Sequence, residues 1–187
     1  MVIEKLRSGT RQTHEELETE MLPLIKGVRD KDSYARLLHL FYGYYHPLEK
    51  GIALHLDSSL LPDIGERRKV SRIIDDLHII GGSVEIREDS NAPLIENRAE
   101  AFGALYVMEG STLGGKVISK MISGNLDFPD ESALSFFSGY GSQTASRWKE
   151  FLAVLDQFSG TAEEEVIVSK ANEVFSEFRV WLKQNIS

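Results

Sequence analysis

The sequence predicts an all-α protein, and two features of its apolar pattern lead to this prediction. Apolar residues recur every three or four positions through each long segment, which is the periodicity of an amphipathic helix. No segment alternates apolar and polar residues for long enough to predict a β-strand. We therefore expect a bundle of helices.

The N-terminal part of the chain predicts two helices. The first covers Ile3–Leu22, where apolar residues and threonines fall at helical spacing and Pro23 follows. The second is predicted to begin near Asp32 or Ser33, both suitable N-caps, and its apolar content continues through Leu56.

A third helix is predicted over residues 61–80, because its apolar residues form one stripe and Gly81 and Gly82 provide a stop signal. Residues 83–97 predict a loop, in which Pro93 is a suitable first residue of the following helix.

The C-terminal part of the chain predicts two further helices. Residues 136–158 begin with an aromatic turn, FFSGYG, and continue as an amphipathic helix. Residues 161–185 form the last helix, and Glu163–Glu165 in its first turn favour the helix dipole.

Length and composition indicate one domain over residues 1–187. Hydrophobic residues make up 42% of the chain and charged residues 27%, which is typical of a soluble globular protein. The formal net charge of -8 argues against a nucleic-acid partner, which requires a basic face. The sequence shows no signal peptide, no membrane span and no cysteine. We expect a cytoplasmic protein without thiolate chemistry.

The segment Ala101–Ile122 predicts a helix that reaches about Ser123, although it contains four glycines. Each glycine in a helix interior costs about 0.5–1 kcal/mol relative to alanine, so the missing Cβ atoms must serve a purpose. One strip of this helix lacks bulk and consists of Gly110, Ser111, Gly114 and Gly115. Either another backbone packs there closely, or a flat macrocycle lies on the helix; the pattern allows both.

Five histidines are present, and no pair has the HExxH spacing of a zinc protease. His14 has the most informative neighbours, because Arg7 and Glu18 share its helix face. An imidazole for iron, a carboxylate that orients it and a cation for a propionate would together hold a haem edge, although a solvated surface has the same pattern. The remaining histidines are expected to be structural or solvated: His39, His46, His55 and His78.

Two stretches of the sequence, LRSGTRQTHEELE and LYVMEGSTLGGKVISKMI, resemble the bacterial haem oxygenases, especially the biliverdin-producing type associated with bacteriophytochromes. FFSGYG and SRWKEFL fit the same family, and the resemblance covers nearly the whole chain. It implies an all-α bundle in which haem is sandwiched between a proximal helix and a kinked distal helix. It also implies degradation of haem to biliverdin, carbon monoxide and ferrous iron. O2 would be the co-substrate, ferredoxin or flavodoxin the electron donor, and a bacteriophytochrome the candidate acceptor of biliverdin.

The resemblance assigns roles to individual residues. His14 matches the proximal iron ligand, and Glu18 matches the acidic residue that helps to hold it. The candidate haem-binding residues are Arg7, His14, Glu18, Gly110, Gly114, Gly115 and Lys149. The candidate catalytic residues are Gly110, Ser111 and Gly114, where the distal glycines let haem and oxygen approach.

The chain departs from the animal enzymes at two of these positions. Ser111 stands where they have an aspartate that anchors the water chain for proton delivery, and Ala153 replaces a propionate-binding arginine. A rotated haem and a different cleavage position are therefore open alternatives.

Other functions are also considered. A haem carrier without turnover would keep His14 and the glycine helix. Thiaminase-like enzymes share the fold but use a cysteine nucleophile, which this chain lacks. A plain helical interaction module would not need Arg7, His14 and the glycine strip in register.

Overall fold

The computed structural model describes residues 1–67, 69–83, 90–126 and 131–186, and the regular structure within these ranges is entirely helical. The all-α prediction is confirmed. The α-helices are α1 (Val2–Gly9), α2 (Arg11–Gly27), α3 (Lys31–Ala53), α4 (Ser71–Ile80), α5 (Arg98–Ser123), α6 (Ser135–Ser138), α7 (Thr144–Leu155) and α8 (Glu163–Asn185). Short 3₁₀ helices cover Ile64–Glu66, Glu131–Leu134, Gly141–Gln143 and Asp156–Phe158.

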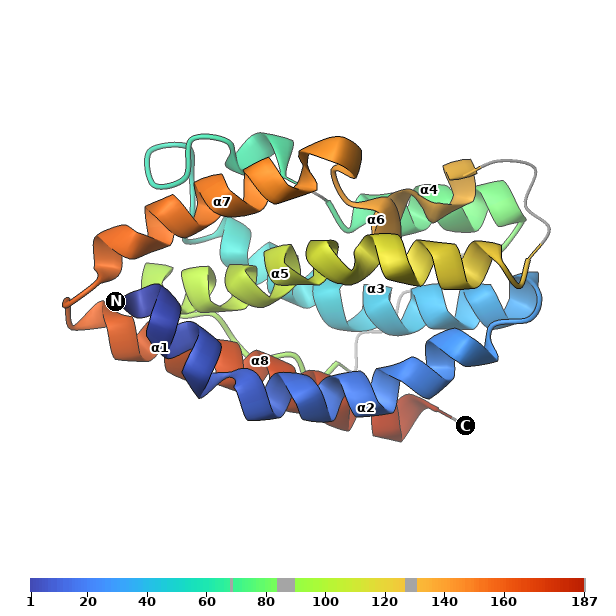
Figure 1. Ribbon diagram of the computed structural model, residues 1–187, viewed down its shortest axis with the longest axis horizontal. Coiled ribbons are helices and arrows are strands. Elements are labelled where there is room, and N and C mark those ends of the chain that lie inside the picture. The colour runs from blue at the N-terminus through green and yellow to red at the C-terminus, as the bar shows by residue number, and fades with distance from the viewer. Residues whose placement is uncertain (68, 84–89, 127–130, 187) are drawn as a thin grey trace.

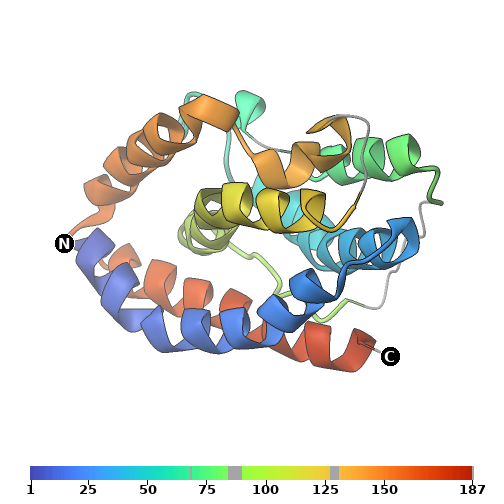
Figure 2. The same cartoon turned by 45° about the vertical axis from the view of Figure 1, so that its right-hand side comes forward.

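The helices form three layers, which Figures 1 and 2 show from two directions. One outer layer contains α1, α2 and α8, the other contains α4, α6 and α7, and α3 and α5 lie between them. The helix α5 packs against α8, α6 and α3, so it is the central element of the bundle. Among the described residues, no helix is long and apolar enough to cross a membrane.

Aromatic rings fill the centre of the core. Tyr44 of α3 stacks on Phe178 of α8 with 4.5 Å between ring centroids, and Phe41 meets Phe136 edge to face at 5.6 Å. Offset and edge-to-face pairs of this kind stabilise a core beyond the area that they bury. They tie α3, α6 and α8 into one unit.

The first predicted helix is in fact two helices, broken at Thr10. The Thr10 hydroxyl donates to the Leu6 carbonyl at 2.6 Å, and Thr10 has φ -100° and ψ -2°, away from regular helix geometry. A threonine that bonds back to the preceding turn bends a helix. The second of the two, α2, then continues through Pro23 to Gly27.

Three other helix starts differ from the prediction. The carboxylate of Asp30 accepts the Ser33 N–H at 2.7 Å, so α3 begins before the predicted cap. Among the described residues of segment 61–80, the α-helix is α4, which ends as predicted at Gly81, where φ is 76° and left-handed. The side chain of Asn97 caps α5, so this helix does not begin at Pro93. Within the predicted loop, residues 84–89 lie outside the described residues.

The second predicted helix ends at Ala53, three residues before the predicted Leu56, and the other predicted segments are helical as expected. The glycine-rich helix ends at Ser123, and α8 covers nearly all of the predicted segment 161–185. The aromatic turn contains α6 and a 3₁₀ turn, and α7 follows it.

Candidate functional site

A cavity of about 790 Å³ lies between α2 and α5, both of which run along the long axis of the molecule (Figure 1). Small-molecule sites typically have volumes of about 300–1,000 Å³. Apolar residues such as Leu17 of α2 and Val107 of α5 line most of it, and Phe136 and Phe137 of α6 close one side. Residues from all three layers of the bundle therefore line the cavity.

His14 lies in the first turn of α2 and lines the cavity. Its side chain is 49% exposed, and Oε1 of Glu18 lies 3.7 Å from its Nε2. The ring of Phe175 meets the imidazole edge-on, with 5.3 Å between centroids. The imidazole thus lies between a carboxylate and an aromatic ring at the cavity wall.

The glycines of α5 divide into two groups. A Cβ on Gly103 would lie 2.5 Å from the Ile167 carbonyl, and a Cβ on Gly115 would lie 1.8 Å from the Phe137 carbonyl. These two glycines allow close backbone packing. Gly110 and Gly114 line the cavity instead, and a Cβ on Gly114 would meet nothing within 4 Å. Close backbone packing therefore explains Gly115, whereas open space for a ligand explains Gly110 and Gly114.

Gly115 therefore differs from its predicted place. It is buried against the turn of α6 and does not belong to the residues that line the cavity, because its direction on the helix is about 100° from that of Gly114. The structure gives it a packing role.

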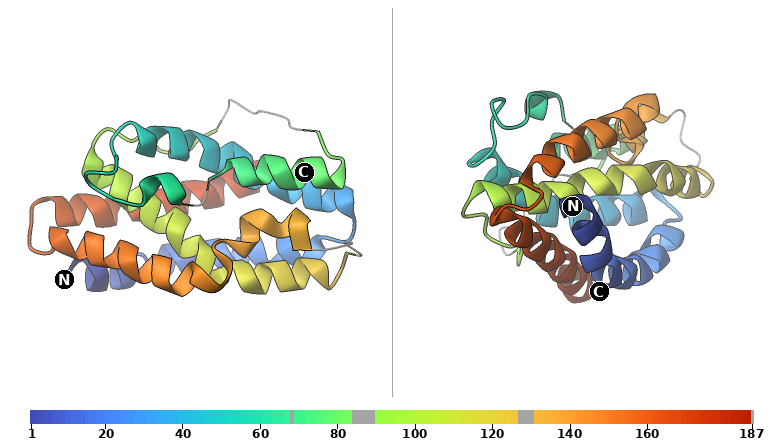
Figure 3. Two further views of the ribbon diagram at one scale, coloured as in Figure 1. Left: turned by 90° about the horizontal axis from the view of Figure 1, so that it is seen from above. Right: turned by 60° about the vertical axis from the view of Figure 1, so that its left-hand side comes forward.

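The helix α5 bends next to the cavity. Figure 3 shows it changing direction near its middle. There the Ser111 hydroxyl donates to the Met108 carbonyl at 2.7 Å, and the Thr112 hydroxyl donates to the Glu109 carbonyl at 2.6 Å. Hydroxyls that bond back into the preceding turn bend helices. Ser111 lines the cavity at this bend.

Two arginines line the cavity, and a predicted lysine does not. Arg11 pairs with Glu15 at 2.9 Å, whereas Arg7 has no carboxylate partner among the described residues. Lys149 is exposed on α7 and lies outside the lining. Arg7 is therefore the cation best placed for an anionic group of a ligand.

The cavity has a polar end and an apolar end. Arg7 and Tyr106 lie at the polar end, where burial raises the pKa of Tyr106 although the positive charge of Arg7 acts to lower it. The other end is lined by apolar side chains of α2 and α5: Met21, Leu22, Ile25, Val117, Ile118 and Met121. A flat molecule with one charged edge and one apolar edge matches this polarity.

The other histidines do not line the cavity. His39 contacts the Ser83 carbonyl at 2.7 Å, His55 contacts the Ile95 carbonyl at 3.0 Å, and His46 stacks on Tyr42. These contacts agree with the structural roles that the sequence predicts for them. His78 lies exposed in the last turn of α4.

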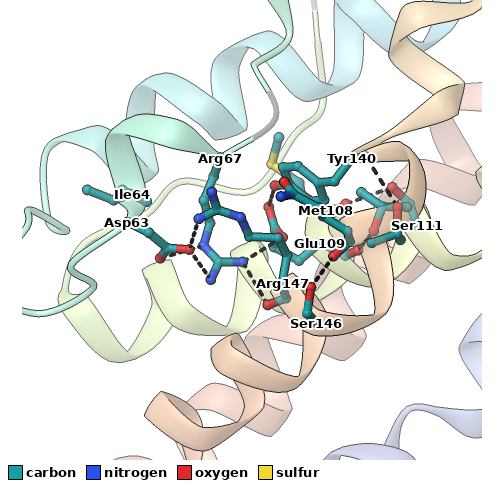
Figure 4. A network of polar contacts seen from close by, with 12 residues as sticks. Asp63, Ile64, Arg67, Met108, Glu109, Ser111, Tyr140, Ser146 and Arg147 are labelled. Carbon is teal, nitrogen blue, oxygen red and sulfur yellow. Dashed lines mark hydrogen bonds and ion pairs between the residues drawn. The ribbon is translucent and has the colours of Figure 1, made fainter.

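A buried polar network behind α5 was not predicted. Glu109, directly before Gly110, is paired with Arg67 and accepts a hydrogen bond from Tyr140, as Figure 4 shows. The network continues through Asp63 to Arg147. The feature of the sequence that could have indicated this network is Glu109 itself, a single carboxylate in the otherwise apolar run AFGALYVMEG.

A histidine helix facing a bent glycine helix across a partly apolar cavity defines a protein that can hold a flat macrocycle. A comparison with protein families then gives the class: the Heme oxygenase family model matches residues 1–73 and 84–184. The chain belongs to the haem oxygenase family.

Individual relatives agree with this assignment. A heme oxygenase of Xanthomonas campestris pv. campestris (strain 8004) is 29% identical over 167 residues, which cover 87% of this chain and 96% of the relative. Heme oxygenase PigA of Pseudomonas aeruginosa is 27% identical over 176 residues, covering 94% of this chain and 88% of PigA.

Solved structures show the same fold. The heme oxygenase of Neisseria meningitidis, determined with NO and CO bound, has a TM-score of 0.79 at 22% identity and covers 99% of this chain and 92% of its own. The heme oxygenase of Leptospira interrogans has a TM-score of 0.76 at 20% identity, with 98% of both chains covered. The predicted haem oxygenase-like bundle is confirmed.

Proposed function

We propose that this protein degrades haem to biliverdin, carbon monoxide and ferrous iron, with O2 and an external electron donor. Membership of the haem oxygenase family supports haem as the substrate. The observation that carries the proposal is the cavity in which His14 of α2 faces the side-chain-free surface at Gly110 and Gly114 of α5.

The cavity residues fit haem. The open space at Gly114 is a cradle that a larger side chain would fill, and a flat ring can lie directly on this backbone. Arg7 at the polar end would bind a propionate, and the apolar end suits the methyl and vinyl groups. Lys149 would serve as a second propionate cation only through its long, exposed side chain.

His14 would hold the haem iron through a ring nitrogen, and the nearby carboxylate of Glu18 would orient its imidazole. When bound, haem supplies the iron that activates O2 and the porphyrin edge that is oxidised. The backbone at Gly110 and Gly114 would confine O2 beside one edge of the ring, which is catalysis by positioning. Ordered water near the Ser111 hydroxyl would carry protons to this space.

The finer assignments rest on the sequence resemblance. Ferredoxin or flavodoxin is the proposed electron donor, and the cytoplasm, where such donors are reduced, is the proposed compartment. A bacteriophytochrome is the proposed acceptor of biliverdin.

Turnover of bound haem tests the proposal. Hemin is added to the purified protein, and ascorbate is then supplied in air while the absorption spectrum is recorded. The Soret band is expected to collapse as a biliverdin band grows, with carbon monoxide released. A Soret band that persists unchanged under ascorbate would instead identify a haem carrier.

A further inference from the structure

Glu109 is a fully enclosed acid that makes two strong contacts behind α5. Its exposure is 2%, and its Oε2 lies 2.8 Å from Nη1 of Arg67. Its Oε1 accepts the hydroxyl of Tyr140 at 2.8 Å. Figure 4 shows these groups converging on one carboxylate from the segment after the first 3₁₀ helix and from the turn after α6.

Among the described residues, carboxylates outnumber guanidinium groups in this cluster. It contains the carboxylates of Asp63, Glu66 and Glu109 and the guanidinium groups of Arg67 and Arg147. Arg67 also contacts Asp63, with Nη2 2.9 Å from Oδ2 and Nε 3.1 Å from Oδ1. The guanidinium group would therefore still have a carboxylate partner if Glu109 were replaced. Burying a further carboxylate is costly, so its retention points to a role beyond charge balance.

The two contacts of Glu109 lie next to the bend of α5 in sequence. The carbonyl of Glu109 accepts the Thr112 hydroxyl within the bend, and the next residue is the cavity-lining Gly110. Gly139, next to Tyr140, packs on Thr112, since a Cβ there would lie 3.2 Å from the Thr112 Cβ. None of Glu109, Arg67 and Tyr140 lines the cavity, so their effect on a ligand must pass through the backbone of α5.

We propose that Glu109 is a positioning residue that fixes the bend of α5 through Arg67 and Tyr140, and so sets the position of Gly110 and Gly114 opposite His14. This inference rests on the proposed haem degradation. We call the contacts of Glu109 with Arg67 and Tyr140 the brace. Haem that binds through His14 needs little from the brace, but the confinement of O2 beside the ring depends on the backbone position of Gly110 and Gly114. Misplacement by about 1 Å can lower a rate about a hundredfold.

The test compares Glu109→Gln with Glu66→Gln as a matched control. Glu66 belongs to the same cluster but is 70% exposed and contacts Arg147, not α5. In the haem-free protein, Glu109→Gln is expected to speed amide hydrogen exchange at residues 106–116 by about tenfold, with α8 unchanged. In the haem complex it should lower turnover by about tenfold or more and change the haem Kd by less than about threefold. Glu66→Gln should match the wild type throughout.

Tyr140→Phe is the second variant, because it removes one hydroxyl and no charge. Like Glu109→Gln, it is expected to speed amide exchange in α5 and to lower turnover, but each by only about threefold. The inference is overturned if Glu109→Gln shows the same amide exchange and turnover as the wild type. If Glu109→Gln does not fold, the same result in Tyr140→Phe overturns it. Failure of the wild type to degrade haem would instead contradict the proposed function, and exchange in the haem-free variants would still decide whether the brace exists.

Discussion

At the scale of single residues, Gly114 and Gly115 are neighbours in α5 with opposite surroundings. Gly114 faces open cavity, whereas Gly115 packs against the Phe137 carbonyl. The same chemical group, a hydrogen in place of a side chain, therefore serves ligand access at one position and backbone packing at the next.

This difference predicts opposite effects of alanine at the two positions. Gly114→Ala should raise the free energy of unfolding by about 0.5–1 kcal/mol through helix propensity, while it weakens haem binding. Gly115→Ala should lower the free energy of unfolding by about 1–3 kcal/mol, because the backbone at Phe137 must move. Urea unfolding and hemin titration of both variants measure the two effects. Similar unfolding free energies for both variants would contradict this placement of the glycines.

Arg7 and Arg11 provide a second matched pair. Arg11 is already paired with Glu15, while Arg7 has no carboxylate partner in the part of the chain that the structure describes. Arg7→Ala should weaken haem binding about three- to tenfold, and the loss should shrink at high salt because the pairing is exposed. Arg11→Ala should change the haem Kd less. Equal losses in both variants would argue against a propionate at Arg7.

The sequence could identify His14, Glu18 and the glycines as candidates, because their types and spacing carry chemistry. It could not separate Gly114 from Gly115, since that depends on where the turn after α6 packs. It also missed the partners of Glu109, because Arg67 and Tyr140 lie 42 and 31 residues away and no periodicity links them.

At the scale of elements, Asp76 joins α4 to the cavity wall. Its carboxylate accepts the Ser135 N–H and hydroxyl at 3.0 and 2.6 Å, and the Phe136 N–H at 3.0 Å. It thereby caps α6, whose phenylalanines close the cavity. Burial is the main reason that the pKa of Asp76 is raised to about 6.

This raised pKa predicts a stability that depends on pH. Between about pH 4 and pH 6 the folded carboxyl holds a proton that the unfolded chain has released, so folding takes up a proton. The contribution of Asp76 to stability therefore falls as pH rises through this window, by about 1.4 kcal/mol per pH unit at most, and is constant above it.

Urea unfolding of the wild type and Asp76→Asn at several pH values tests this. Carboxyls with lowered pKa, such as Glu20 and Glu163, act in the opposite sense, so only the difference between the proteins isolates Asp76. The wild type should lose stability relative to Asp76→Asn as pH rises from about 4 to 6. A difference that stays constant with pH would contradict the burial of a protonated carboxyl.

The periodicity of the sequence predicted which segments are helical but located several of their ends incorrectly. The break at Thr10 depends on a hydroxyl bond to the preceding turn, and the start of α5 depends on the Asn97 cap. In both cases a local side-chain hydrogen bond decides where the helix ends or begins. The apolar spacing of the neighbouring residues would be the same with or without that bond.

At the scale of the whole molecule, α2 of one outer layer, α5 of the middle layer and α6 of the other outer layer all line the cavity. Ion pairs contribute to holding α2 on α8, including Lys183 with Glu20 at 2.8 Å and Arg179 with Glu16. A ligand that binds both α2 and α5 would add contacts between this outer layer and the middle layer.

Haem is accordingly expected to stabilise the whole fold. At a free haem concentration of a hundred times Kd, the free energy of unfolding should rise by about 2.7 kcal/mol. Urea unfolding with and without hemin measures this gain. If hemin leaves the unfolding midpoint of the wild type unchanged, haem does not bind the folded cavity.

The most direct test of the account is the spectrum and turnover of His14→Ala beside the wild type. The account predicts that this variant loses the histidine-ligated Soret band and the formation of biliverdin, and that added imidazole restores both, since the cavity otherwise remains intact. A variant that keeps the wild-type Soret band and degrades haem without imidazole would show that His14 is not the ligand and that haem binds elsewhere.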